Sequence, residues 1–208
     1  MSDSPVTGIG PAPAGHVNSW YAATAHPGPA FPGLRENLDV DVAIVGAGFT
    51  GINTAIELAD RGYRVAVLEA QRAGWGCSGR NGGQMIAGLA SYQRLVRQLG
   101  PDDAGKIWRL GVEGLDLIQR RIQRFGIQCE LKMGVFTAAC NRRQMQALRD
   151  DLACEQRLGY PHSLELIERD RLRTVIGTDA YLGGVMDHGS GHLHPLNLCL
   201  GEAAGAAG

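Results

Sequence analysis

The stretch that most constrains the fold is Asp41–Ala70, which reads DVAIVGAGFTGINTAIELADRGYRVAVLEA. An apolar run over 42–45 predicts a short buried strand, a helical pattern continues to about Arg61, and a second apolar run over 65–68 predicts another strand. Glycines lie between the first strand and the helix. This order of strand, glycine turn, helix and strand predicts a parallel βαβ unit.

The residue types of this unit suit a dinucleotide. Gly46 permits the tight turn off the strand, Gly48 lets the backbone approach a pyrophosphate, and Gly51 allows close packing of the helix on the sheet. Phosphates bind at such a helix N-terminus through free N–H groups and the helix dipole. Glu69 ends the second strand, where its carboxylate can accept hydrogen bonds from both hydroxyls of an adenosine ribose. This unit alone does not distinguish FAD from NAD, and a glycine turn without a ligand has a similar signature.

The segment that follows carries a resemblance to a known family. Residues 71–84 read QRAGWGCSGRNGGQ. Together with the upstream unit, this run resembles the FAD-dependent amine and amino-acid oxidases of the D-amino-acid oxidase superfamily, in particular the gamma-glutamylputrescine oxidase-like branch. In that branch a GWGxSGRNGGQ run follows the ribose-binding acid, and Cys77 stands where alanine is commoner. Ser19–Ala25 and residues 191–204, GHLHPLNLCLGEAA, resemble two further family segments.

The resemblance implies an α/β fold, with a Rossmann-like FAD-binding domain and part of an α+β substrate domain, truncated at the C-terminus. It implies an FAD-dependent oxidoreductase that oxidises a C–N bond of an amine or amino acid. Dioxygen would be the acceptor, and the products would be an imine or aldehyde and hydrogen peroxide. Family members are longer than 208 residues, so we expect an N-terminal part whose activity alone is an open question.

The expected cofactor-binding residues form two groups. The first group holds the pyrophosphate and the adenosine ribose, and consists of Gly46, Gly48, Gly51 and Glu69. The second group is placed by the resemblance and consists of Ala70, Arg72, Gly76, Ser78, Arg80, Asn81, Gly82, Gly83 and Gln84. Of these, we expect Ser78, Arg80, Asn81, Gly82 and Gln84 on the flavin side. Glycines and short polar side chains let backbone amides line a flat cofactor, and an arginine can meet a phosphate. No side chain stands out as a catalytic base.

Two alternatives stay open. A NAD-dependent dehydrogenase would use the glycine motif but would leave the GWGCSGRNGGQ segment without a role. A non-catalytic nucleotide-binding fragment or interaction module would have the same sequence.

The bulk composition excludes several classes of partner. A net charge of −1 and a pI of about 6.6 leave no basic surface for nucleic acid or an anionic membrane. The N-terminus has no basic start followed by an apolar core, and no apolar run reaches about 18 residues. The five cysteines are far apart and form no CxxC pair, which indicates reduced thiols. We therefore expect a cytoplasmic protein with a small-molecule substrate; the sequence does not indicate its oligomeric state.

The pattern along the chain predicts four regions. Residues 1–38 form an arm held by Trp20 and Tyr21, 39–90 the FAD-binding unit, 91–190 a partial substrate or cap region, and 191–208 a return segment toward the FAD domain. Within 91–190 we expect helices broken near Gly100-Pro101, and then further elements. These are a strand or hairpin over 128–139, a helix over 142–158, a strand over 164–167, a short helix over 169–176 and a strand over 181–186.

Three histidines, His188, His192 and His194, lie within seven residues and raise the question of a metal site. No carboxylate or cysteine completes a recognisable ligand spacing, although Asp187 is adjacent. We therefore expect no metal, and a structural or substrate-cleft role instead. On a strand, His192 and His194 would share one face, and Pro195 would begin a helix.

Overall fold

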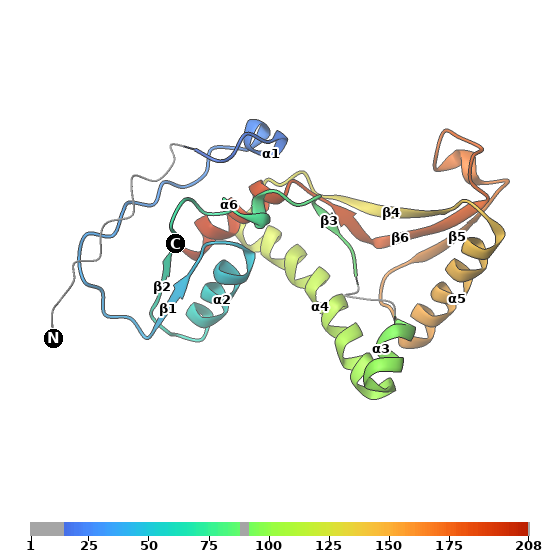
Figure 1. The fold of residues 1–208 in the computed structure, drawn as a ribbon, viewed down its shortest axis with the longest axis horizontal. Helices are drawn as coiled ribbons and strands as arrows, with labels where there is room; N and C mark the ends of the chain where they lie inside the picture. Colours follow the sequence, from blue (N-terminus) through green and yellow to red (C-terminus); the bar gives the residue numbers. More distant parts are fainter. Residues whose placement is uncertain (1–14, 88–91, 208) are drawn as a thin grey trace. The chain divides into compact units, whose positions relative to one another are not determined.

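The computed structural model of the chain describes residues 15–87 and 92–207 (Figure 1). The described residues form two compact units. The first unit contains the residues up to Gly82, the segment 124–129, and the residues from His194 onward. The second unit contains the described residues of 83–123 and 130–193.

The first unit contains the βαβ motif predicted from the sequence. Its elements are α1 (Trp20–Thr24), β1 (Val42–Val45), α2 (Phe49–Asp60), β2 (Val65–Leu68), the 3₁₀ turn η1 (Cys77–Gly79) and α6 (Pro195–Ala206). β1 and β2 are parallel, with Val42 opposite Val65 and Val45 opposite Leu68. The predicted strands and the helix that joins them are therefore confirmed.

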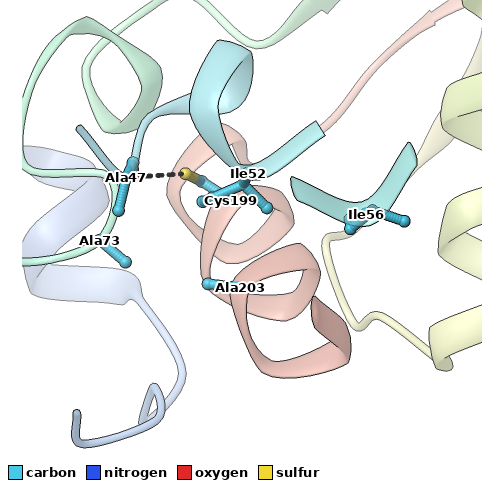
Figure 2. Close-up of a cluster of buried hydrophobic side chains, with 6 residues drawn as sticks. All are labelled: Ala47, Ile52, Ile56, Ala73, Cys199 and Ala203. Carbon is cyan, nitrogen blue, oxygen red and sulfur yellow. Dashed lines mark hydrogen bonds between the residues drawn. The ribbon is translucent and has the colours of Figure 1, made fainter. Parts of the chain in front are cut away.

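The core of the first unit lies between α2 and α6. Ile52 and Ile56 of α2 are 2% exposed, and they pack against Cys199 and Ala203 of α6 (Figure 2). Burying each isoleucine side chain contributes about 1.5–3 kcal/mol to folding. The Cys199 thiol donates to the carbonyl of Ala47 at 3.8 Å, and burial raises the pKa of this thiol to about 12. This core joins the glycine turn to a helix about 150 residues later in the chain.

Segment 124–129 completes this unit. A Cβ added to Gly201 of α6 would lie 2.4 Å from the Ile127 side chain, so the two segments touch at a glycine. The Arg124 guanidinium donates two hydrogen bonds to the carboxylate of Asp60, the last residue of α2, at 2.6 and 2.7 Å. The chain thus returns to the first unit twice after residue 82.

The second unit is built around an antiparallel sheet whose central strand is β6 (Gly183–His192). β4 (Lys132–Ala139) pairs along the length of β6, while β5 (Leu164–Glu168) and β3 (Gln84–Met85) pair with its two ends. The helices of this unit are α3 (Tyr92–Leu99), α4 (Pro101–Phe125) and α5 (Arg142–Leu158). In Figure 1, β6 lies between β4 and β5, and α5 packs against all three strands.

Several predicted elements of the second unit match the structure. The break at Gly100-Pro101 is confirmed, because Gly100 has φ +82° and α4 begins at Pro101. α5 covers the predicted 142–158, with Asn141 as its N-cap and Gly159 in the left-handed conformation after its end. β5 matches the predicted strand, and β4 begins at Lys132, within the predicted 128–139.

Other expectations were wrong. The strand predicted over 181–186 extends to His192, because its glycines interrupt the apolar alternation yet permit close pairing. A Cβ on Gly184, for example, would lie 2.3 Å from the carbonyl of Thr137 on β4. The helix predicted over 169–176 is only the 3₁₀ turn η2 (Leu172–Thr174).

The N-terminal arm also differs from expectation. Trp20 is 75% exposed and does not hold the arm, whereas Tyr21 packs edge-on against the His194 ring at 5.0 Å between centroids. The compact units divide the chain at 82/83, and Gln84 pairs with β6 opposite His192; the expected domain bounds stay a prediction.

Candidate cofactor-binding site

The glycine turn between β1 and α2 has the backbone geometry that a phosphate site requires. Gly46 has φ +101°, a conformation that side chains rarely adopt, and a Cβ at this position would have no atom within 4 Å. A Cβ on Gly51 would lie 2.0 Å from the carbonyl oxygen of Gly46, so only glycine permits this approach of the helix to the turn. The turn is therefore tight on its inner side and open at Gly46.

The N-terminus of α2 leaves backbone donors available. The N–H of Ala47 donates to Glu69 Oε2 at 2.8 Å, and the N–H of Phe49 donates to Ser78 Oγ at 2.9 Å. Across the described part of the chain, the N–H groups of Gly48, Thr50 and Gly51 have no partner. Unpaired N–H groups at the positive end of a helix dipole bind anions, so these three groups suit a diphosphate.

Glu69 lies next to this turn, as its predicted role requires. Its Oε2 accepts the Ala47 N–H, and its Oε1 accepts the N–H of Gln71, each at 2.8 Å. Each carboxylate oxygen keeps a further lone pair, because a carboxylate offers about four acceptor sites. Glu69 therefore orients its carboxylate through the backbone and can still accept bonds from ribose hydroxyls.

The loop that follows Glu69 returns to the glycine turn through Ser78. The Ser78 hydroxyl is 29 residues from Phe49 in sequence, yet it caps the first N–H of α2. A Cβ on Gly48 would lie 2.8 Å from that same oxygen, so a side chain at this position would push the Ser78 hydroxyl away from its bond to Phe49. Ser78, expected on the flavin side, thus lies beside the turn expected to hold the pyrophosphate.

Two glycines of the loop pack against α6. A Cβ on Gly74 would lie 3.0 Å from the Leu196 side chain, and one on Gly79 would lie 2.2 Å from the Gly74 carbonyl. The N–H of Gly74 donates to the Ala47 carbonyl at 2.8 Å. The loop is therefore fixed between the glycine turn and α6 rather than projecting into solvent.

Arg80 and Asn81 fold back onto their own loop. The Arg80 guanidinium carbon lies 5.0 Å from the centroid of the Trp75 ring, and its Nε donates to the Gly76 carbonyl at 3.2 Å. The Asn81 amide donates to the carbonyls of Cys77 and Ser78 at 3.2 and 3.0 Å. These contacts shape the loop and place a cation on its exposed side.

Two side chains near this turn have buried polar atoms without partners. Nε1 of Trp75 and Oε1 of Gln71 are buried, and neither has a hydrogen-bond partner among the residues that the structure describes. An unsatisfied buried donor or acceptor costs about 1–3 kcal/mol. This cost, together with the open helix N-terminus, fits a site that is completed by a ligand with both donors and acceptors, such as FAD. Sequence reasoning missed both residues, because solvent access to one side-chain atom is a property of the fold.

The other predicted residues lie as follows. Ala70 and Arg72 are exposed directly after Glu69, and Gly76 precedes η1 with open space around its Cα. Gly82 is the last residue of the first unit before the chain enters the second. Gly83 and Gln84 belong to the second unit, where the Gly83 carbonyl accepts the N–H of Leu193 at 2.9 Å and Gln84 begins β3.

The three histidines do not form one cluster. His188 lies 3.8 Å from a Glu165 carboxylate oxygen in the second unit, and His192 is the last residue of β6. His194 is not on that strand, which corrects the expected shared face: it is the N-cap of α6, and its Nδ1 accepts the N–H of Asn197 at 3.1 Å. Pro195 begins the helix, as predicted. Over residues 15–87 and 92–207, no group of His, Cys, Asp or Glu side chains could hold a metal ion.

A set of buried and half-buried polar side chains lies in the second unit. The Tyr160 hydroxyl donates to both carboxylate oxygens of Asp187 at 3.1 Å, and Ser190 Oγ donates to the same carboxylate at 2.5 Å. Burial, and then the Asp187 charge, raises the pKa of Tyr160. Trp108 Nε1 donates to Glu155 at 2.8 Å, and burial raises the pKa of this carboxyl group. The Trp108–Glu155 bond joins α4 to α5, the Tyr160 and Ser190 bonds to Asp187 tie the residues after α5 to β6, and the Trp108 and Tyr160 rings meet edge-on at 6.4 Å between centroids. These satisfied bonds indicate a structural role.

No helix in the described part of the chain is long and apolar enough to cross a membrane. The structure pairs none of the five cysteines in a disulfide.

Comparison with known proteins agrees with this geometry. A family model described as FAD dependent oxidoreductase (DAO) matches residues 41–208. The chain is 41% identical over 190 residues to Probable oxidoreductase OrdL of Haemophilus influenzae, and 39% identical over 192 residues to Gamma-glutamylputrescine oxidoreductase of Escherichia coli. Each match covers 90% of this chain and 44% of the relative, so the chain spans less than half the length of these relatives.

Solved structures show the same fold. The chain matches L-amino acid deaminase from Proteus myxofaciens with a TM-score of 0.71 and 21% identity, covering 88% of this chain and 39% of that one. It matches glycine oxidase from Bacillus cereus with a TM-score of 0.59 and 22% identity, covering 81% and 44%. These matches confirm the predicted α/β fold class.

Proposed function

The chain belongs to the DAO family of FAD-dependent oxidoreductases, and from this premise we propose that it binds FAD at the glycine turn and acts on a C–N bond of an amine or amino acid. The observation that carries the proposal is the open N-terminus of α2, where three N–H groups have no partner among the described residues and the preceding Ala47 N–H donates to the Glu69 carboxylate. Donors for a diphosphate beside an acceptor for ribose hydroxyls match the adenosine diphosphate half of FAD.

Within the proposal, each residue of the turn has a specific task. Gly48, Thr50 and Gly51 would donate their N–H groups to the diphosphate, and Glu69 would accept from the ribose. Ser78 would keep the turn in shape by accepting the N–H of Phe49. The flavin-side assignments are Ser78, Arg80, Asn81, Gly82 and Gln84, and they rest on the resemblance of residues 74–84 to the family run.

When bound, FAD supplies the acceptor of two electrons, and the protein supplies orientation and exclusion of water. In the proposed net reaction, the C–N carbon and its nitrogen together lose two protons and two electrons, which leaves an imine. Dioxygen takes up these two electrons and two protons and becomes hydrogen peroxide. Water then hydrolyses the imine to a carbonyl compound and releases the nitrogen as ammonia or an amine.

The proposed substrate class is supported by one relative. The protein from Escherichia coli that is 39% identical is named Gamma-glutamylputrescine oxidoreductase, so an amine is the first substrate to test. The likeness to an amino acid deaminase and a glycine oxidase supports the fold alone at 21% and 22% identity.

The cofactor is tested by an absorbance spectrum of the purified chain after incubation with excess FAD and removal of the unbound part. We expect a retained flavin spectrum that excess NAD does not displace. The variant Glu69→Ala should weaken FAD binding by about tenfold or more, because hydrogen bonds to a charged group contribute about 1.5–3 kcal/mol. Glu36→Ala, at an exposed glutamate of the same unit, is the matched control and should bind like the wild type.

A chain that retains no flavin would contradict the proposed site, and displacement by NAD would favour a NAD-dependent dehydrogenase. The reaction is tested by adding amines to the FAD-loaded chain while dissolved oxygen and peroxide are followed. Equal consumption of oxygen and release of peroxide are expected. Bleaching of the flavin without peroxide would refute dioxygen as the acceptor.

A further inference from the structure

The loop after Glu69 contains a donor that neither the glycine motif nor the ribose acid explains. Nε1 of Trp75 is buried and has no partner in the described part of the chain. An indole N–H can only donate, so the missing partner is a hydrogen-bond acceptor. Buried donors in native proteins are almost always satisfied, and an orphan in a binding region points to a ligand.

The Trp75 indole is held by its backbone neighbour and by Arg80. The N–H of its neighbour Gly74 donates to the Ala47 carbonyl. Gly74 also packs closely on Leu196, since a Cβ added to Gly74 would lie 3.0 Å from that side chain. The Arg80 guanidinium covers the ring at 5.0 Å and is itself held by the Gly76 carbonyl. The N–H therefore has a defined position, which lowers the entropic cost of using it in binding.

Trp75 is also close in the chain to both contacts that tie this loop to the glycine turn. Gly74 contacts Ala47, and Ser78 contacts Phe49, the residues that flank Gly48. The Arg80 cation over the Trp75 ring adds positive potential around the indole. An electron-rich acceptor at the glycine turn is the partner that this arrangement favours.

We propose that Trp75 Nε1–H donates a hydrogen bond to an acceptor atom of bound FAD, and thereby positions the cofactor against the loop. This inference rests on the proposed function and adds to it a residue outside the expected binding set. Phosphate oxygens and the carbonyl oxygens of the flavin ring share the required acceptor chemistry, and the experiment distinguishes these two sources.

The test compares Trp75→Phe with the wild-type chain. Phenylalanine keeps an aromatic ring beneath Arg80 and removes the N–H. We expect FAD affinity, measured by titration of flavin fluorescence, to fall by about tenfold, which corresponds to about 1.4 kcal/mol. Trp20→Phe is the matched control, because Trp20 is 75% exposed in the same unit, and its FAD affinity should equal that of the wild type.

A second readout separates binding from mere stability. Without FAD, Trp75→Phe should melt at the same temperature as the wild type or higher, because it removes an unsatisfied buried donor. A parallel titration with ADP locates the acceptor. Weakened binding of both ADP and FAD would assign the N–H to the diphosphate, and weakened binding of FAD alone would assign it to the flavin.

The failures are distinguishable. If the wild-type chain binds FAD and Trp75→Phe binds it equally well, the role of Trp75 is refuted while the proposed function stands. A lower melting temperature of cofactor-free Trp75→Phe with unchanged FAD affinity would likewise assign Trp75 a packing role only. If the wild-type chain binds no FAD, the proposed function fails, and this inference fails with it.

Discussion

Replacing Gly51 by alanine tests the close approach on which the glycine turn depends. The added Cβ would lie 2.0 Å from the carbonyl oxygen of Gly46, whereas ordinary contact begins near 3.4 Å. The helix and the turn must therefore separate by roughly 1.4 Å, and both partners are backbone, so no side-chain rotation can relieve the clash. Such overpacking costs about 1–3 kcal/mol, and a displacement this large belongs at the upper end.

Part of this cost is offset, because alanine favours a helix over glycine by about 1 kcal/mol. We expect a net destabilisation of about 2 kcal/mol, which lowers the melting temperature by about 4–8 °C for a chain of this length. FAD affinity should fall as well, since the separation moves the N–H groups of Thr50 and Gly51.

Gly114→Ala in α4 is the matched control, because a Cβ there meets no atom within 4 Å. The same substitution should then raise the melting temperature, by about 2–4 °C, through helix propensity alone. Differential scanning calorimetry measures both shifts. If Gly51→Ala were as stable as the wild type, or gained stability like Gly114→Ala, the reasoning about the turn would be refuted.

Three further outcomes are expected. Burial raises the pKa of Glu155, so the protonated carboxyl group stabilises the fold below the ordinary glutamate pKa, and this stability is lost as pH rises through the folded-state pKa. Glu155→Gln should therefore melt at a higher temperature than the wild type at pH 7 but not at pH 4. An equal effect of the substitution at both pH values would contradict this. Asn141→Ala removes the acceptor for the N–H of Gln144 and should lower the free energy of unfolding, measured with urea, by about 1 kcal/mol. An unchanged urea midpoint would argue against a stabilising cap at Asn141. Burial raises the pKa of the Cys199 thiol to about 12, so Cys199 should resist a thiol reagent at pH 8 in the folded chain. The exposed thiols of Cys77 and Cys140 are the reference, and modification of Cys199 as fast as theirs would show that this core opens.

Local patterns in the sequence determined the elements that depend on neighbouring residues. The bounds of β1 and β2 could be predicted because each is a short apolar run ended by glycine or charge, and α5 because an asparagine cap and a terminal glycine frame it. The proximity of the glycine turn and Glu69 could be predicted because the dinucleotide motif has a fixed spacing, and in the structure the Ala47 N–H donates to Glu69.

Only the tertiary structure decided the features that depend on contacts between distant residues. β6 extends as far as His192 because its glycines allow close pairing with β4. Glycines carry no apolar side chains, so the sequence of this strand shows no apolar alternation from which its length could be predicted. Ser78 reaches Phe49 across 29 positions, and His194 caps a helix rather than continuing a strand. The unpaired indole N–H of Trp75 is likewise invisible in the sequence, because solvent access to a single atom depends on the whole unit around it. Short-range backbone preferences are written in neighbouring residues, whereas burial and long-range hydrogen bonds exist only once the chain has folded.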